Sequence, residues 1–148
     1  MEDNIVLLLK QLNLFLEQYR REQMKNLDIS PSQSLVLDYL LSRKGCTVYA
    51  TELHEKFGIS KAAISATLKS LRQKGYVKMV VNPKDDRKKQ IILMSKAYKI
   101  EQYIDASLME QQAYLCREIP KQHLEILESG LNTMIRNMKR EPIRRNET

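Results

Sequence analysis

The chain has 148 residues, 43% of them hydrophobic and 29% charged, which fits one globular domain that can bury a core. Its N-terminal aliphatic run, IVLLL at 5–9, is far shorter than the roughly 20 apolar residues that span a bilayer. Two acids precede this run, so we expect neither a membrane segment nor a secretory signal. Cys46 and Cys116 lie far apart in the sequence, which favours reduced thiols in a cytoplasmic protein over a disulfide.

The positive charge is concentrated in one quarter of the chain. Residues 60–96 hold ten cations and two acids, a net charge of +8, whereas the whole chain carries +7 and the remainder therefore −1. A local basic patch is typical of a protein that binds a polyanion, while a solvated charged surface usually mixes both signs. We therefore expect this segment to bind a polyanion.

Two helices are predicted before residue 45. Apolar side chains recur at helical spacing along residues 4–25, which predicts a long amphipathic helix. Ser30-Pro31-Ser32-Gln33 predicts the start of a second helix, because it combines a capping serine, a proline at the first helical position and a Gln that closes a capping box. This helix should end near Arg43 and bury Leu37, Leu40 and Leu41.

The basic segment is predicted to hold a helix-turn-helix followed by a hairpin. A short extended piece leads to a short helix over 50–57, the turn Gly58-Ile59-Ser60, and a second helix from its cap Ser60 to about Lys74. Gly75 suits a left-handed C-cap. The runs YVKMVV and QIILM are extended and joined by NPKDDRKK, which predicts a hairpin with a long charged tip.

The C-terminal third is predicted to be helical. Ser95 should cap a long helix whose apolar side carries Ala97, Ile100, Ile104, Leu108 and Leu115. Pro120 restarts a last helix with an apolar stripe from Leu124 to Met138. The polar residues 140–148 should form a flexible tail.

The helix after Ser60 has an unusually bare outer side. Its core stripe is expected to be Ile64, Leu68 and Leu71, with Thr67 beside them, and its outer side holds mostly Ala and Ser. Alanine is also simply the best helix former at a surface position. However, a major groove about 12 Å wide admits a helix whose backbone lies close to the base edges, and small side chains permit that approach. Within a basic helix-turn-helix this favours DNA binding, by Ser60, Lys61, Ala62, Ala63, Ser65, Ala66, Lys69 and Ser70.

From about residue 5 to 138 the chain resembles the MarR-type winged helix-turn-helix transcription regulators. NPKDDRKKQIILMSKAY is similar to the wing of that family, with Asp85 and Arg87 as its Asp-x-Arg pair. ISPSQSLVLDYL is similar to its second helix, and LRQKGYV to its turn into the wing. The resemblance implies a mainly α fold, with a winged helix-turn-helix core at 30–95 between dimerisation helices at 1–29 and 96–139.

The resemblance further implies a homodimer on a roughly palindromic operator, mostly as a repressor. Arg87 is expected in the minor groove, oriented by Asp85, with Lys84 and Lys88 on phosphates. Ala66 lies where many relatives carry a base-contacting Arg, so DNA shape should carry more of the specificity. The amphipathic ends of the chain independently predict dimerisation, through Ile5, Leu8, Leu12, Leu124, Leu127, Leu131 and Ile135.

Similar proteins respond to small aromatic or amphipathic ligands, to oxidants or to metals. From this resemblance, a small aromatic or amphipathic effector is the implied small-molecule partner. The first helix lacks the Cys of peroxide sensors, and His54 and His123 do not form a pair at metal-ligand spacing, so thiol sensing is less expected and no metal or cofactor is expected. The sequence has no phosphate-binding Gly loop or nucleophile elbow, which predicts that it is not an enzyme. A winged-helix module for protein contacts and a general DNA-binding protein remain the alternatives.

Overall fold

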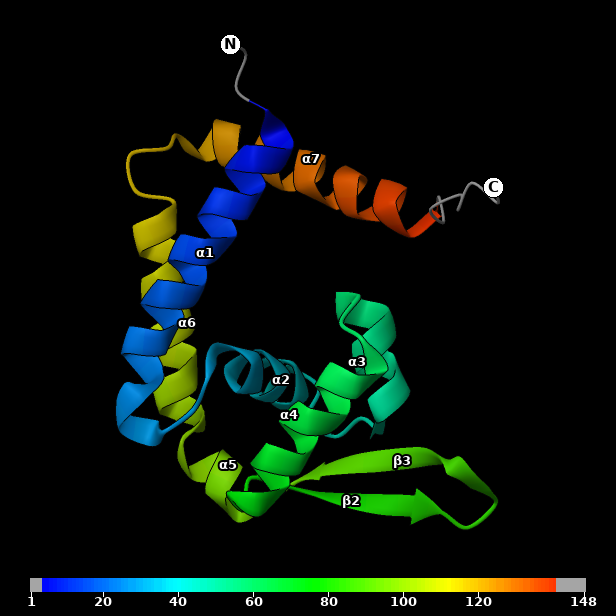
Figure 1. Ribbon diagram of the computed structural model, residues 1–148. Coiled ribbons are helices and arrows are strands. Elements are labelled where there is room, and N and C mark those ends of the chain that lie inside the picture. Colours follow the sequence, from blue (N-terminus) through cyan, green and yellow to red (C-terminus); the bar gives the residue numbers. More distant parts are fainter. Residues whose placement is uncertain (1–3, 141–148) are drawn as a thin grey trace. The chain divides into compact units, whose positions relative to one another are not determined.

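The computed structural model describes residues 4–140, and of Asp86, Arg87 and Arg140 only the backbone. The fold is mainly helical (Figure 1). Its helices are α1 (Ile5–Met24), α2 (Pro31–Ser42), α3 (Ala50–Phe57), α4 (Lys61–Gln73), α5 (Ser95–Lys99), α6 (Glu101–Leu115) and α7 (Lys121–Arg140), with a 3-10 turn η1 (Lys25–Leu27). Strands β1 (Val48–Tyr49), β2 (Val77–Asn82) and β3 (Asp85–Leu93) form an antiparallel sheet in the order β1-β3-β2.

The chain consists of two compact units that divide after Gln111, within α6. The first unit contains the helices up to most of α6 and the whole sheet, and the second contains the end of α6 and all of α7. The domain boundaries expected from the sequence stay a prediction. The tail predicted from residue 140 onward lies outside the described residues, apart from the backbone of Arg140.

The local signals in the sequence place the helix ends as expected. The Ser30 side chain accepts a hydrogen bond from the Gln33 backbone N–H, and the Gln33 side chain accepts one from the Ser30 N–H, which confirms the capping box. Gly75 follows α4 with φ at +83°, in the left-handed region that favours glycine. These caps set where α2 begins and where the chain leaves α4 for the sheet.

The core of the first unit lies between α2, α3, α4 and the sheet. Leu37, Leu40 and Leu41 of α2 are buried, as are Leu53 of α3 and the stripe of α4, and each of these was expected from the spacing. The stripe consists of Ile64, Leu68 and Leu71, with Thr67 half-buried. Because α4 buries this side, its other side faces away from the core, where a ligand can reach it.

Two predictions about the segment from 82 to 100 are wrong. The hairpin tip is short, because β3 already begins at Asp85 and only Pro83 and Lys84 connect the strands. Charged residues can continue a two-stranded ribbon, since most of their side chains reach solvent on either face. Ser95 does not cap a helix: Met94 occupies the N-cap of α5 without a side-chain hydrogen bond. The long helix expected there is interrupted at Ile100, between α5 and α6.

A buried arginine joins three helices of the first unit. Arg20 of α1 is only 5% exposed. Its Nε donates to Ser34 Oγ of α2 at 2.6 Å, its Nη1 to Ser107 Oγ of α6 at 2.8 Å, and its Nη2 to Asp38 Oδ1 of α2 at 2.9 Å. Burial raises the pKa of Asp38 to about 6, although the positive charge of Arg20 opposes that shift. The apolar spacing along residues 4–25 predicted the length of α1, but it did not predict that Arg20 is buried.

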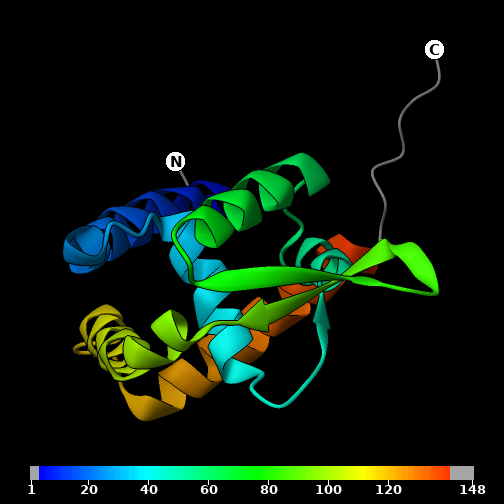
Figure 2. The ribbon, with the colours of Figure 1, turned by 90° about the horizontal axis from the view of Figure 1, so that it is seen from below.

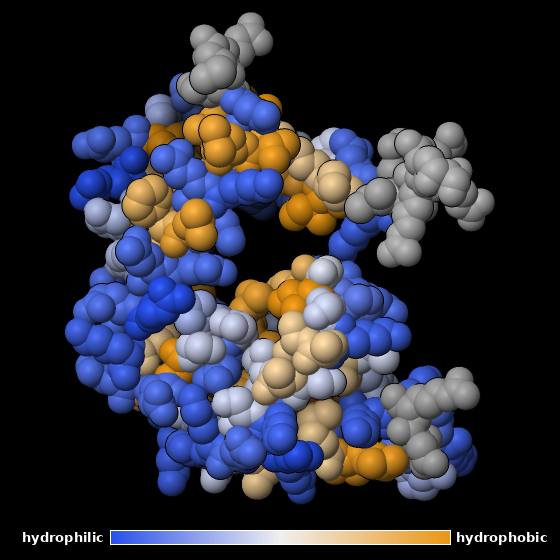
Figure 3. Space-filling model, viewed as in Figure 1, coloured by the Kyte–Doolittle hydropathy of each residue, from blue (hydrophilic) through white to orange (hydrophobic). Residues whose placement is uncertain are grey.

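Much of α1 is hydrophobic on its surface. Leu7, Leu14 and Phe15 are each more than three-fifths exposed, and Figure 3 shows hydrophobic side chains on the surface over the N-terminal half of this helix. Contiguous exposed apolar surface of this kind usually marks an interaction site.

Among the described residues, no helix has the length and the hydropathy needed to cross a membrane.

Candidate nucleic-acid interface

The helix-turn-helix consists of α3, the turn at Gly58 and α4. Gly58 ends α3 with φ at +67°, and its N–H donates to the His54 carbonyl. His54 is half-buried, and its Nδ1–H donates to the carbonyl oxygen of Ile59 at 2.5 Å. Ser60 then caps α4 by accepting a hydrogen bond from the Ala63 N–H. These bonds fix the angle at which α4 leaves the turn.

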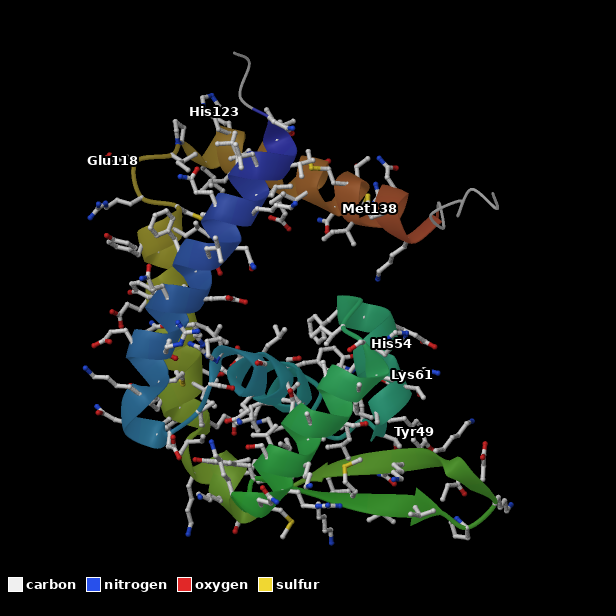
Figure 4. All side chains as sticks on the ribbon, in the orientation of Figure 1. Tyr49, His54, Lys61, Glu118, His123 and Met138 are labelled. Carbon is white, nitrogen blue, oxygen red and sulfur yellow. The ribbon has the colours of Figure 1, made fainter. Side chains whose placement is uncertain are left out.

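The outer side of α4 is small, exposed and cationic. Its exposed residues in the first three turns are Lys61, Ala62, Ala63, Ser65, Ala66 and Lys69, and the capping Ser60 is exposed as well. Figure 4 shows Lys61 at the N-terminal end of α4, near the helix that carries His54. Seven of the eight residues predicted for the recognition helix therefore share one accessible side of the helix-turn-helix.

Ser70, the eighth predicted residue, has a partner within the protein. It is half-buried, and its hydroxyl accepts a hydrogen bond from Gln33 Nε2 at 2.8 Å. Gln33 Oε1 also accepts from Lys74 Nζ at 2.9 Å, and Lys74 Nζ bonds to the Asp28 carbonyl oxygen. The Gln33 side chain therefore caps α2 and also holds the C-terminal end of α4. Its place in the capping box did not indicate this second role.

The wing is the hairpin of β2 and β3, which projects beyond the helices of the first unit (Figure 2). Its register is regular from Val77↔Leu93 to Val81↔Lys89 and then shifts, so that Asn82 pairs with Asp85. Asp86, Arg87 and Lys88 consequently have no pairing partner on β2 and form an irregular outer part of the wing. Irregularities of this kind re-aim side chains near functional sites.

The structure describes the side chains of three of the four residues predicted for the wing. Lys84 is exposed at the tip, Asp85 is half-buried, and Lys88 is exposed with its Nζ 5.8 Å from the centre of the Tyr49 ring. The side chain of Arg87 lies outside the described residues, so its minor-groove contact and its ion pair with Asp85 stay predictions. The wing brings the predicted residues of 84–88 together at one end of the hairpin.

Among the described cations of 60–96, Lys74 and Lys96 donate hydrogen bonds to groups within the protein. Lys74 holds Gln33 and Asp28, as described above. Lys96 Nζ donates to the Lys74 carbonyl oxygen at 2.6 Å and lies 4.5 Å from the centre of the Tyr76 ring. Lys74 and Lys96 therefore stabilise the junction of α4, β2 and α5. A count of charges in the sequence could not tell these structural lysines from lysines that contact DNA.

The predicted dimerisation residues are accessible on their own units. On α1, Ile5, Leu8 and Leu12 are between 41% and 55% exposed. On α7, Leu127, Leu131 and Ile135 are between 43% and 54% exposed, and Leu124 is half-buried. Apolar side chains left so exposed over several turns are typical of an interface.

The residues considered for redox or metal chemistry belong to different elements of the two units. Cys46 is exposed, Cys116 is half-buried, and both are free thiols. His54 lies in α3 and His123 in α7 (Figure 4). Among the side chains that the structure describes, no three His, Cys, Asp or Glu are grouped so that they could hold a metal ion.

A hollow of about 400 Å³ lies inside the first unit between α1, α2 and α4. Its wall is mostly apolar, with Leu16 from α1, Leu35 and Val36 from α2, and Ile64 from α4. Arg20 and Glu17 of α1 supply charge at its edge. A partly apolar hollow with a few polar groups is the usual form of a small-molecule site.

The sequence and the fold were compared with known proteins. Residues 27–88 match the model of the MarR family. A search of the curated proteins found no match. Among solved structures, MarR from Oenococcus oeni PSU-1 is 26% identical, over 90% of this chain and 99% of that one, with a TM-score of 0.76.

Two further structures share the fold at lower identity and were solved with DNA. S. aureus MepR in its DNA complex is 18% identical over 93% of this chain and 100% of that one, with a TM-score of 0.84. A MarR-family transcriptional regulator from Listeria monocytogenes, complexed with a 26mer DNA, is 14% identical over 93% of this chain and 90% of that one, with a TM-score of 0.85.

The matched segment runs from the end of η1 through the helix-turn-helix into the irregular part of the wing. It therefore contains the bare face of α4 and every predicted wing contact. Residues 27–88 thus match the MarR family, and MarR structures share the fold of this chain over about nine-tenths of its length.

Proposed function

We propose that this chain is a sequence-specific DNA-binding transcriptional regulator, mainly a repressor, which binds a pseudo-palindromic operator as a homodimer. It would act in the cytoplasm and without catalysis. The observation that carries the proposal is the outer side of α4, where small exposed side chains and two lysines stand on a helix that Ser60 caps and that Gln33 of α2 holds through Ser70. The DNA complexes of two structural neighbours support it.

The proposed contact of α4 follows from its dimensions. A helix enters the major groove only if its backbone comes close to the base edges. Ala62 and Ala66 leave room for that approach, while Lys61 and Lys69 supply charge for phosphates on either side. With few long polar side chains at the centre of this face, we expect much of the specificity to come from the shape and deformability of the DNA.

The wing would lie along the adjacent minor groove. Its unpaired outer part carries Arg87 and Lys88, and narrow minor grooves concentrate the negative potential that attracts such side chains. Lys84 at the tip would lie on a phosphate. The half-buried Asp85, one residue from the unpaired part, supports the proposed role of orienting Arg87.

The dimer would form through α1, α6 and α7. The exposed apolar residues of α1 and α7 support this, because burying several leucines and isoleucines stabilises an interface by roughly 25 cal/mol per Å² of apolar surface. A two-fold dimer presents two copies of α4 at a fixed separation. Successive major-groove sites on one side of a duplex lie one helical turn apart, so the operator should be an inverted repeat.

A size series at Ala66 tests the central contact. The target is the duplex that the wild-type protein enriches from a randomised library. We expect Ala66→Ser to bind this duplex like the wild type and Ala66→Leu to bind at least about tenfold more weakly, because leucine holds the helix backbone away from the bases. Fluorescence anisotropy gives both affinities. Equal binding by both variants, with unchanged melting temperatures, would refute the α4 assignment.

The same measurements separate the two alternatives. A module for protein contacts would show no duplex binding at low salt, although its fold is intact. A general DNA-binding protein would enrich no sequence from the library and would bind random and selected duplexes equally. A regulator is expected to prefer its selected duplex by about 10³-fold or more.

We further propose that a small aromatic or amphipathic effector releases the DNA by binding the hollow between α1, α2 and α4. A ligand there would favour one spacing of the two recognition helices over another. A bound phenolic acid or cationic dye should raise the melting temperature and weaken duplex binding, and Leu35→Gln, which removes part of the apolar wall, should lessen both effects. A panel that produces neither effect would count against the effector.

A further inference from the structure

A second hollow lies between α4 and the inner face of the wing. Its volume is about 350 Å³, roughly ten times the share of one water molecule in the liquid, so it can receive a group larger than a solvent molecule. Lys69 and Arg72 of α4 and Lys89 of β3 line it, above an apolar floor that includes Leu68 and Met79. Figure 1 shows the wing leaving the C-terminal end of α4, so the two elements form the sides of this angle.

The backbone places the three cations on this hollow. Lys69 and Arg72 are three residues apart in α4 and so share one flank of the helix. On the sheet, Lys89 pairs with Val81, and alternation along β2 puts Val81 on the same face as Met79, which packs toward the core. Lys89 therefore points from the wing back toward α4.

These three cations have no acidic partner among the side chains that the structure describes. No carboxylate lines the hollow, and within the described residues none lies within ion-pair distance of Lys69, Arg72 or Lys89. All three are exposed. Three like charges gathered on one concavity repel one another, and an anion placed among them would relieve that repulsion. Lys74 and Lys96, by contrast, are already engaged by carbonyl oxygens.

The geometry of DNA supplies such an anion. Adjacent major and minor grooves are separated by a single sugar–phosphate strand. If α4 lies in a major groove and the wing tip in the next minor groove, that strand must pass through the angle between them. Arg72 lies on a different side of α4 from Ala62 and Ala66, so it faces this strand rather than the bases that the alanines approach, and Lys69 lies between the two sides.

We propose that this hollow is a seat for the phosphodiester groups of the strand between the two grooves, held by Lys69, Arg72 and Lys89. Arg72 and Lys89 are additional to the contacts expected from the sequence. The seat rests on the proposed DNA binding and deepens it: it fixes how far the duplex enters the angle and therefore the register of α4 in its groove. Its contribution is independent of sequence, because phosphates carry no base information.

Salt dependence tests the seat. Because the dimer carries two copies of the seat, each of Lys69→Gln, Arg72→Gln and Lys89→Gln should reduce the slope of log affinity against log salt by about 1.8, and the triple variant by about 5.4, on selected and random duplexes alike. Arg72→Lys should keep the wild-type slope because it keeps the charge. Lys99→Gln in α5, which removes an exposed cation elsewhere, is the matched control and should also leave the slope unchanged.

The outcomes separate this inference from the proposed function. If the wild type binds DNA but the triple variant keeps its slope, the seat is refuted while DNA binding stands. If the wild type binds no duplex, the proposed function itself fails. A titration with pyrophosphate shows whether the hollow binds a free anion instead of DNA phosphate. Suppose that pyrophosphate raises the melting temperature of the wild type but not of the triple variant, and that the salt slope of DNA binding is the same for both proteins. The hollow would then be a site for a small anion, and the proposal would be overturned. Equal melting temperatures of all variants confirm that the fold is intact.

Discussion

Replacing Arg20 with methionine is expected to lower the free energy of unfolding by about 3–5 kcal/mol at pH 7. Methionine fills much of the same space, so the loss does not come from a cavity. It comes from leaving the Asp38 carboxylate largely buried without its counter-charge, which costs more than the pair contributes when intact. Ser34 and Ser107 also lose the donor that joins α2 and α6 to α1. Urea denaturation measures the change.

The pH dependence of this loss identifies its cause. The pKa of Asp38 is raised to about 6 in the folded protein, from 3.8, so the folded state takes up this proton first as pH falls. Acidification from pH 7 to pH 5 should therefore stabilise the wild type by about 1 kcal/mol and the methionine variant by more, because its carboxylate has no partner. The difference in the free energy of unfolding between the wild type and the methionine variant should therefore become smaller toward pH 5.

Arg21→Met provides the matched control for this experiment. Arg21 is the exposed neighbour of Arg20 on α1, and the same substitution there removes the same charge from the helix. We expect a change within about 0.5 kcal/mol and no dependence on pH. A loss in Arg20→Met that equals the control, or that is the same at pH 5 and pH 7, would show that the buried pair does not join the helices as described.

Placing aspartates on the exposed stripe of α7 is expected to separate the proposed dimer. In the variant Leu127→Asp with Ile135→Asp, two carboxylates would have to be buried in the interface without partners. The particle mass should fall from twice 17.4 kDa to 17.4 kDa in light scattering. Affinity for the selected duplex should fall by about 10²–10⁴-fold, because each monomer then binds one half-site without help from the other.

A charge-matched variant separates this effect from a loss of helix stability. Ser129→Asp with Asn137→Asp adds the same two charges at exposed positions of α7 that lie outside the apolar stripe. This variant should remain dimeric and keep its affinity. If both double variants dissociate, the added charges destabilise α7 itself rather than an interface on its apolar stripe. If neither does, the interface lies elsewhere on the chain.

Local signals predicted most of the fold. The capping box at Ser30, the turn at Gly58 and the left-handed Gly75 each depend on a few adjacent residues, and the structure has all three. The apolar spacing of α4 likewise predicted which side would be buried, and hence which side would be free to meet a ligand. Features of this kind are legible in a single sequence because their partners are near neighbours in the chain.

Features that depend on distant partners were not predicted. Arg20 finds its acceptors at Ser34, Asp38 and Ser107, and its place in an amphipathic helix gave no sign of burial. The tip of the wing was expected to be long, because a run of charges resembles a loop, whereas the pairing of Asn82 with Asp85 extends the ribbon. The role of Lys89 in the hollow beside α4 depends on strand register, which only the structure supplies.

Selection from a randomised duplex library shows at once whether the protein binds DNA, distinguishes its sequence and does so as a symmetric pair. We expect an enriched inverted repeat whose half-sites are centred about one helical turn, roughly 10–10.5 base pairs, apart. An enriched motif without two-fold symmetry, or a pool that stays random after repeated rounds at low salt, would contradict this expectation.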